Sequence, residues 1–180
     1  MDREKILEEY RKIITIDSIK ARDLIKKLDY KEDAFLLRCI AQTYLDESRF
    51  EADGTPREFL NWRKLKMAER YIIKAYTIDP NCSRVVYTMG SVRRSMGQTD
   101  VAIYCYDKVI KLGIRGGSSK RCPVDNELAK ELINDSKFEL YRLYYEDNRK
   151  LAEKYLARYK KGLEKGINSI YVPLEQFLLE

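Results

Sequence analysis

The residues best placed for chemistry lie in a glycine-rich basic segment, GIRGGSSKRCPVD, which follows Leu112. Between Lys108 and Val124 the chain has five basic residues and no acidic one. A glycine-rich loop before a helix can hold a phosphate through its backbone N–H groups. The spacing G-x-x-x-x-G-K-[ST] of a P-loop is absent, so the sequence favours a flexible, solvated connection over an anion site. The glycines and cations concerned are Gly113, Gly116, Gly117, Arg115, Lys120 and Arg121.

Catalytic and metal-binding motifs are not evident. The chain contains no histidine, which removes the commonest general base, the Ser–His and Cys–His dyads and any histidine-containing metal site. The four cysteines, Cys39, Cys82, Cys105 and Cys122, form no Cys-x-x-Cys motif. Cys39 and Cys105 lie on apolar helix faces, as expected of small core residues. We therefore expect a protein with no catalytic activity, cofactor or metal ion.

Composition limits the remaining classes. The chain has 180 residues and a net charge of +6, enough for weak attraction to acidic surfaces but no requirement for nucleic acid. No apolar run approaches the length of about 18 residues that a membrane span needs. The N-terminal segment MDREKILEEYRK is charged and lacks the apolar core of a signal peptide. We expect a cytoplasmic protein that does not contact a membrane.

Apolar residues recur every three or four positions along most of the chain, which is typical of amphipathic helices. We expect one all-α domain over residues 1–180. Its helix hairpins are expected at about 2–28, 33–79, 83–112 and 125–166, with a short capping helix within 169–180. Asp17 and either Asp125 or Asn126 are suited to cap helices, and Asp33 begins one. The apolar tail is expected to cover the last hairpin; binding a partner is the alternative.

The segment from Ser83 to Gly116 has the clearest pattern, with two amphipathic helices joined by a short turn. Gly97 suits the end of the first helix, because glycine adopts positive φ without strain. Thr99 or Asp100 can cap the second. Gly90 lies inside the first helix, where glycine costs about 1 kcal/mol relative to alanine. A glycine retained there indicates that another helix comes close.

These residues resemble the tetratricopeptide repeat (TPR), a helix pair with a period of about 34 residues and small side chains where its helices cross. The matching residues are Gly90, Gly97, Ala102, Tyr106 and, less closely, Val109. The match is best over 83–116, partial over 34–82, where Ala41 and Ala68 fit the pattern, and divergent over 2–30 and 127–166. The resemblance implies about four antiparallel hairpins stacked into a right-handed superhelix.

An insertion at about 46–62 separates the two helices of the second unit. Thr55 can cap a helix with Pro56 at its first position, so we expect the second helix to run from about Arg57 to Thr77. Phe59, Leu60 and Trp62 are then expected to pack back on the first pair. The alternative is that the insertion forms one wall of a binding site.

The resemblance also implies a concave groove lined by the first helix of each pair. The residues that would face it are Arg38, Gln42, Arg84, Tyr87, Ser91, Arg94, Lys137, Tyr141, Tyr144 and Tyr145. Tyrosine and arginine offer large contact areas with directed hydrogen bonds. The expected function is a non-catalytic adaptor that holds a protein or an extended peptide, with an acidic peptide or a C-terminal carboxylate as suitable partners. The lysine–asparagine clamp of chaperone-tail binders is not matched, because the asparagines are missing.

Two other functions remain open. The segment from Arg149 to Lys165 has seven basic and two acidic residues. A solvated outer face explains this charge, and contact with single-stranded nucleic acid is the alternative. A homo-oligomeric structural protein, joined through the apolar tail or the insertion, is the third hypothesis.

Overall fold

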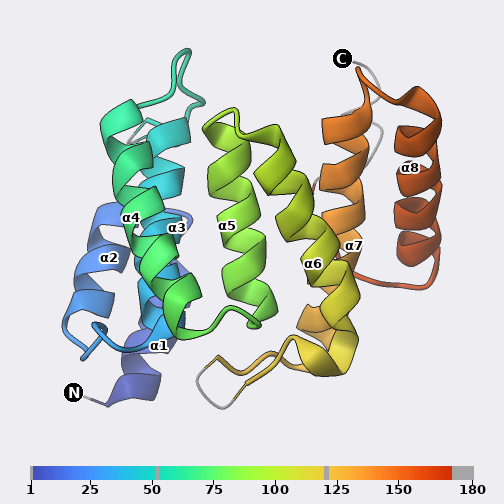
Figure 1. Ribbon diagram of the computed structural model, residues 1–180. Helices are drawn as coiled ribbons and strands as arrows, with labels where there is room; N and C mark the ends of the chain where they lie inside the picture. The colour runs from blue at the N-terminus through green and yellow to red at the C-terminus, as the bar shows by residue number, and fades with distance from the viewer. Residues whose placement is uncertain (1, 52, 120–121, 172–180) are drawn as a thin grey trace.

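The computed structural model describes residues 2–51, 53–119 and 122–171. Within these residues the chain forms eight α-helices and no β-strand, so the predicted all-α class is confirmed. The helices are α1 (Arg3–Ile13), α2 (Ser18–Lys26), α3 (Ala34–Arg49), α4 (Trp62–Ile78), α5 (Ser83–Ser95), α6 (Thr99–Gly116), α7 (Asn126–Tyr144) and α8 (Arg149–Glu164). Figure 1 shows α4 in front of α3, with α5, α6, α7 and α8 following beside them in chain order.

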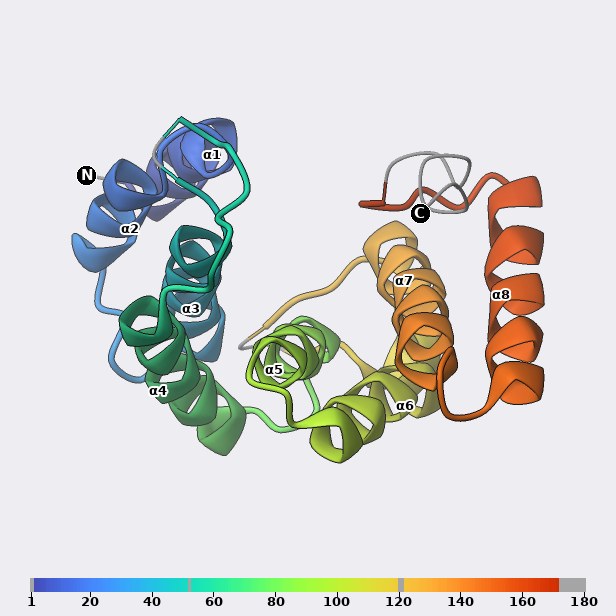
Figure 2. The same cartoon turned by 90° about the horizontal axis from the view of Figure 1, so that it is seen from above.

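The helices pack as consecutive pairs, α1–α2, α3–α4, α5–α6 and α7–α8. Seen from above, the pairs form an arc, with α1, α3, α5 and α7 on its inner side and the even-numbered helices on its outer side (Figure 2). α3 also packs on α5, and α5 on α7, which makes the inner helices one wall. Throughout the described residues, helices pack only against helices one or two places away in chain order.

Small residues lie where the helices of a pair cross. Ala41 of α3, Ala68 of α4 and Ala102 of α6 are fully buried. A Cβ atom on Gly90 of α5 would lie 2.9 Å from the ring of Tyr106 on α6, closer than such contacts normally come. The close approach expected at Gly90 is confirmed, and the large ring of Tyr106 fills the space that the missing side chain leaves.

The insertion differs from the sequence expectation. α4 begins at Trp62, with the side chain of Asn61 accepting a hydrogen bond from the Lys64 N–H, so the predicted start near Arg57 is wrong. Thr55 does not cap a helix, because its N–H and hydroxyl both donate to Asp53 within a turn. The Arg57 N–H donates to the carbonyl of Arg49, which keeps this segment extended beside the end of α3.

The apolar side chains of the insertion do not all pack back on the first pair. Phe59 is 78% exposed and Trp62 55% exposed, and Leu60 is half-buried against the core. The expectation that these residues extend the apolar face of α4 is wrong for Phe59 and Trp62. Because α4 starts later, both lie outside the stretch that faces α3.

The turns and caps follow the sequence in most places. Asp17, Asp33 and Asp125 each accept a hydrogen bond from a backbone N–H in the first turn of α2, α3 and α7. Gly97 has a φ of 72°, as predicted for the end of α5. Neither Thr99 nor Asp100 caps α6, because that helix begins at Thr99 and its N-cap residue, Gln98, makes no side-chain cap.

The glycine-rich connection after α6 is anchored to the start of α5. Cys82 and Cys122 form a disulfide, with Cα atoms 6.0 Å apart, that the sequence did not indicate. The Ser83 N–H donates to the carbonyl of Gly117 over 2.9 Å, and the Ser119 hydroxyl donates to Asp79. The expectation of a flexible, solvated connection is wrong at these positions, because both cysteines and Gly117 are buried. Cys39 and Cys105 are buried free cysteines of the core, as predicted.

Some sequence expectations concern residues outside those described. They are the basic residues Lys120 and Arg121 and the part of the C-terminal cap after Tyr171. Among the described residues, no helix has the length and apolar character needed to cross a membrane.

Candidate binding groove

A cavity of about 1030 Å³ lies on the inner side of the arc, and we call it the inner groove. Its lining comes from α1 and the turn after it, from α3, from the insertion, and from α5, α7 and Ile170. Cavities of this size are typical of ligand sites in proteins. Apolar side chains from opposite walls face it, including Leu7 of α1, Ile14 directly after α1, and Leu132 of α7. The inner groove can therefore bury apolar groups of a partner.

The charges around the inner groove balance. Five lining residues are basic and five are acidic, and two are tyrosines, Tyr10 and Tyr87. The lining is thus amphipathic. It differs from the basic, tyrosine-rich surface that we expected from the sequence. The positions of the individual charged residues therefore matter more than the net charge of the lining in deciding what the groove can bind.

The acidic residues near the insertion are neutralised within the protein. Glu47 pairs with both Arg22 and Lys64. Glu51 pairs with Arg57 over 2.7 Å. Glu47 thus joins α3 to α2 and α4, and the Arg57 side chain, which also donates to the Glu47 carbonyl, holds the insertion at the end of α3. The acidic groups at this end of the groove are therefore paired.

Arg38 of α3 and Arg84 of α5 lie at the centre of the inner wall without a carboxylate partner among the described residues. The Arg38 Nε donates to the Thr88 hydroxyl over 3.2 Å, which directs the guanidinium toward α5. The Arg84 guanidinium lies 5.3 Å from the centre of the Phe35 ring. Burial lowers the pKa of Arg84, and the positive charge of Arg38 lowers it further. The pKa of Arg38 is raised in spite of its burial, because neighbouring Cys39, Tyr10 and Asp46 favour its charged form. The repulsion between the two guanidinium groups is therefore felt at Arg84.

The hydrogen-bonding capacity of Arg84 is incompletely used. Its Nε is buried and has no hydrogen-bond acceptor within the described part of the chain. A buried donor without an acceptor costs about 1–3 kcal/mol. This Nε is enclosed by protein, so an anionic oxygen of a partner in the groove would act on the charge of Arg84 and reduce its repulsion with Arg38.

Gln42 lies one turn beyond Arg38 and donates to Asp46 over 2.9 Å. Burial raises the pKa of Asp46 to about 6, although the bond from Gln42 and the charges of Arg49 and Arg38 oppose the shift. Gln42 is therefore engaged in holding Asp46, and its carbonyl oxygen is the part available to a partner.

Tyr87, Ser91 and Arg94 of α5 take part in a buried polar network between α5 and α7. The Tyr87 ring lines the inner groove, and its hydroxyl lies 2.9 Å from that of Tyr171. The Ser91 hydroxyl lies 3.1 Å from that of Tyr106. Arg94 pairs with the buried Glu139 of α7 over 3.1 Å. Ser91 and Arg94 do not line the groove, because their polar groups are used inside the wall.

The four expected residues of α7 lie apart from the inner groove. Lys137 lines a different pocket, beside α8. Tyr144 stacks on Tyr155 with ring centres 5.9 Å apart. Tyr145 packs against Tyr141 and lies 4.1 Å from the Arg149 guanidinium. The structure thus brings together Arg38, Gln42, Arg84 and Tyr87, and places the other six expected residues elsewhere.

Two walls of the inner groove were not assigned from the sequence. One is α1 with the turn after it, whose apolar residues Leu7, Tyr10 and Ile14 line it. Their helical spacing was visible, but the repeat register of this first pair was poor. The other wall is the insertion, through Phe50 and Arg57, which matches the alternative role considered for that segment.

The described residues contain no group of three or more cysteine, aspartate or glutamate side chains placed to hold a metal ion. Comparison with protein-family models, with curated proteins and with solved structures gives no match to this chain.

Proposed function

We propose that this chain is a TPR-like helical repeat, with about four hairpins wound into a right-handed superhelix, that binds an extended protein segment in the inner groove. The serial packing of helix pairs and the small residues at their crossings support the repeat architecture. The proposed role is that of a non-catalytic cytoplasmic adaptor. A reducing cytoplasm would keep the Cys82–Cys122 bridge open. The redox state of these two cysteines in cells therefore tests the proposed location.

The observation that carries the proposal is the pair Arg38 and Arg84, which line the inner groove and form no ion pair with a carboxylate of the described residues. Two neighbouring guanidinium groups without carboxylate partners form a site for an anion, because arginine binds carboxylates through paired, charge-assisted hydrogen bonds. The partner's anionic group would be an aspartate, a glutamate or a C-terminal carboxylate.

The apolar walls define the rest of the segment. Leu7 and Ile14 on one side and Leu132 on the other would enclose apolar side chains next to the anionic group. Burial of apolar area contributes about 25 cal/mol per Å², so this contact supplies affinity while the arginines set register. The segment that fits is an extended peptide with apolar residues near one carboxylate.

The test begins with a displayed library of random peptides selected on the parent protein. For a selected peptide, changing Arg38→Gln and Arg84→Gln together is expected to raise Kd about tenfold or more, since two charge-assisted contacts are lost. Fluorescence anisotropy with the labelled peptide measures the change, and circular dichroism checks that helix content is retained.

A matched control removes two arginines from the outer side. Arg63 and Arg70 are exposed on α4, so Arg63→Gln with Arg70→Gln changes the net charge equally and should leave Kd unchanged. An equal increase in Kd for both double variants would show that the effect comes from overall charge and not from the groove. A library that yields no binder, or binders indifferent to the groove variant, would contradict the proposed function.

Salt dependence separates the alternative of single-stranded nucleic acid. Phosphate-backbone binding weakens steeply as salt rises, whereas a peptide held by apolar walls and one carboxylate weakens little. Homo-oligomerisation, the third hypothesis, is measured by light scattering on the same samples.

A further inference from the structure

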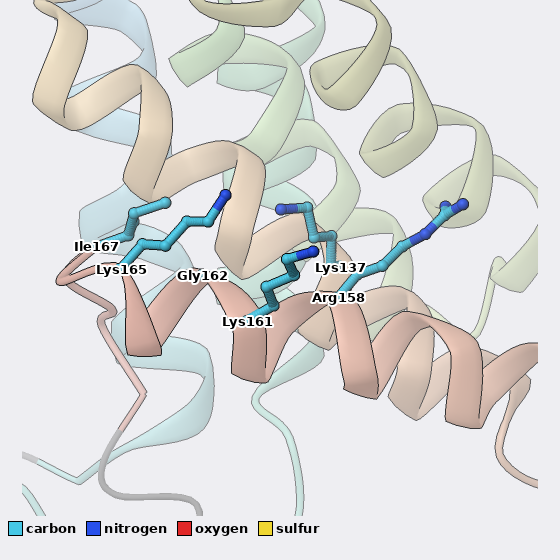
Figure 3. A pocket seen from close by; sticks show the side chains of 6 residues that line it. All are labelled: Lys137, Arg158, Lys161, Gly162, Lys165 and Ile167. Carbon is cyan, nitrogen blue, oxygen red and sulfur yellow. The ribbon is translucent and has the colours of Figure 1, made fainter.

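A second pocket, of about 370 Å³, lies between α7 and α8 (Figure 3), and we call it the α7–α8 pocket. Its lining residues are Lys137, Arg158, Lys161, Gly162, Lys165 and Ile167. None of them lines the inner groove. It is a shallow site, because Arg158, Lys161 and Lys165 are exposed and only Lys137 is half-buried.

The α7–α8 pocket carries positive charge without a counter-charge. Four of its six lining residues are cationic and none is acidic. Among the described residues, none of these four cations takes part in an ion pair, whereas Arg149 on the same helix pairs with Glu153. Figure 3 shows the ammonium groups of Lys137, Lys161 and Lys165 on the same side of α8, with Arg158 extending away from them. All four cations nevertheless belong to one cluster, because Arg158 lines the pocket and its charge acts on Lys137.

These like charges act on one another. Burial lowers the pKa of Lys137, and the charges of Arg158 and Lys165 lower it further. α8 has two acidic residues that could relieve this repulsion, Glu153 and Glu164, but neither of them lines the pocket. Binding of an anion from solution would reduce the repulsion among these cations.

The floor of the pocket is rigid. Asn134 of α7 is fully buried, and its amide N–H donates to the carbonyl of Tyr159 on α8 over 3.2 Å. The Asn134 side-chain oxygen accepts a hydrogen bond from the Lys137 ammonium over 3.2 Å, which fixes that lysine at the pocket. Gly162 allows the contact, because a Cβ atom there would lie 2.6 Å from the Asn134 Nδ2. Lys137 is thus positioned by the packing of the two helices and not by solvent.

We propose that the α7–α8 pocket binds a small phosphate-bearing anion, with a diphosphate or triphosphate group as the best fit. Each lysine ammonium has three donors and each phosphate several acceptor oxygens, so three lysines can share one group. A phosphate dianion neutralises more of the cluster than a carboxylate does. The pocket is concave and confined to one helix pair, whereas a nucleic-acid strand needs cations that follow successive phosphates.

The direct test is calorimetric titration of the full chain with inorganic pyrophosphate, at fixed low ionic strength. Pyrophosphate is expected to bind, and acetate at the same ionic strength is not. The double change Lys161→Gln with Lys165→Gln is expected to weaken pyrophosphate binding about tenfold or more, since two of the four cations that line the pocket are lost. Both lysines are exposed, so the variant should fold as the parent does.

The matched control is Lys150→Gln with Lys154→Gln, which removes two exposed lysines from the same helix outside the pocket. This control should bind pyrophosphate as the parent does. Failure of pyrophosphate to bind the parent, or equal weakening in both lysine variants, overturns the proposal.

A single strand of poly-dT gives the competing outcome. Poly-dT binding that both lysine variants weaken equally, combined with no binding of pyrophosphate, would make α8 a nucleic-acid face and overturn the small-anion site. Pyrophosphate binding that only the pocket variant weakens supports the site, whatever the inner groove binds.

Discussion

Replacing Gly162 with alanine is expected to lower the free energy of unfolding by about 2–4 kcal/mol. The added Cβ atom would lie 2.5 Å from Cγ and 2.6 Å from Nδ2 of Asn134. Asn134 is fully buried and bonded to Tyr159, so it cannot move aside without losing that hydrogen bond. Helix propensity acts in the opposite direction, since alanine is favoured over glycine by about 1 kcal/mol. The steric conflict and the lost bond exceed that gain. Urea denaturation of parent and variant measures the difference.

Gly116→Ala provides the matched control for Gly162→Ala. A Cβ atom on Gly116 of α6 would meet only Leu112, at 3.9 Å, an ordinary contact distance. This variant should be as stable as the parent or slightly more stable. The double variant Gly162→Ala with Asn134→Ala should lose less than the sum of its single changes, because removing the amide relieves the clash. A Gly162→Ala protein as stable as the parent would show that α7 and α8 are farther apart than described.

The stability of Asp135→Asn relative to the parent is expected to rise by roughly 4 kcal/mol or somewhat less between pH 4 and pH 8. Burial raises the pKa of Asp135 to about 7, although hydrogen bonds from the Ser169 hydroxyl and the Ile170 N–H oppose the shift. The folded protein thus holds a proton that the unfolded chain has released. The parent loses this contribution as pH rises through 7, and asparagine, which does not titrate, removes the effect.

The comparison of the two proteins at each pH isolates Asp135. Asp46, whose pKa is also raised, titrates in both and cancels. Ser169→Ala should make the pH dependence of the parent steeper, because it removes a hydrogen bond that favours the charged form. Denaturant midpoints measured across the pH range give the result. Parallel pH profiles for parent and Asp135→Asn would mean that Asp135 is ionised in the fold with an ordinary pKa.

The helices and their crossings were accessible from the sequence because they depend on local spacing. The apolar period and the small residues placed Gly90 against a neighbouring helix, and Tyr106 is the residue it meets. The start of α4 was not accessible in this way. Thr55 and Asn61 are both good helix caps, and the choice between them depends on the hydrogen bonds that the Arg57 and Asn61 N–H groups donate to carbonyls at the end of α3.

The inner groove was only partly predictable for a related reason. Arg38 and Arg84 follow from the positions of first helices in a repeat, and both line it. Arg94 occupies an equivalent position but is drawn into the wall by Glu139, a buried acid on another helix. The disulfide between Cys82 and Cys122 likewise joins residues 40 apart in the chain, which no local pattern shows.

The α7–α8 pocket illustrates the same limit. The basic composition of α8 was evident, and a solvated outer face was the simplest interpretation. The composition could not show that Gly162 allows α8 to pack against Asn134 of α7. Asn134 in turn holds Lys137, which lines the same pocket as Lys161 and Lys165.

Contacts limited to helices one or two places apart in the chain have a mechanical consequence. No contact between α1 and α8 closes the arc, so the position of α1–α2 depends on its contacts with α3, which include the ion pair of Arg22 with Glu47 and the bond from the Tyr10 hydroxyl to the Cys39 carbonyl. Because α1 supplies one wall of the inner groove, the width of the groove entrance depends on how α1–α2 is held against α3. A partner too large for the entrance would therefore have to break the contacts between α1–α2 and α3, and those contacts set the size of segment that the groove admits.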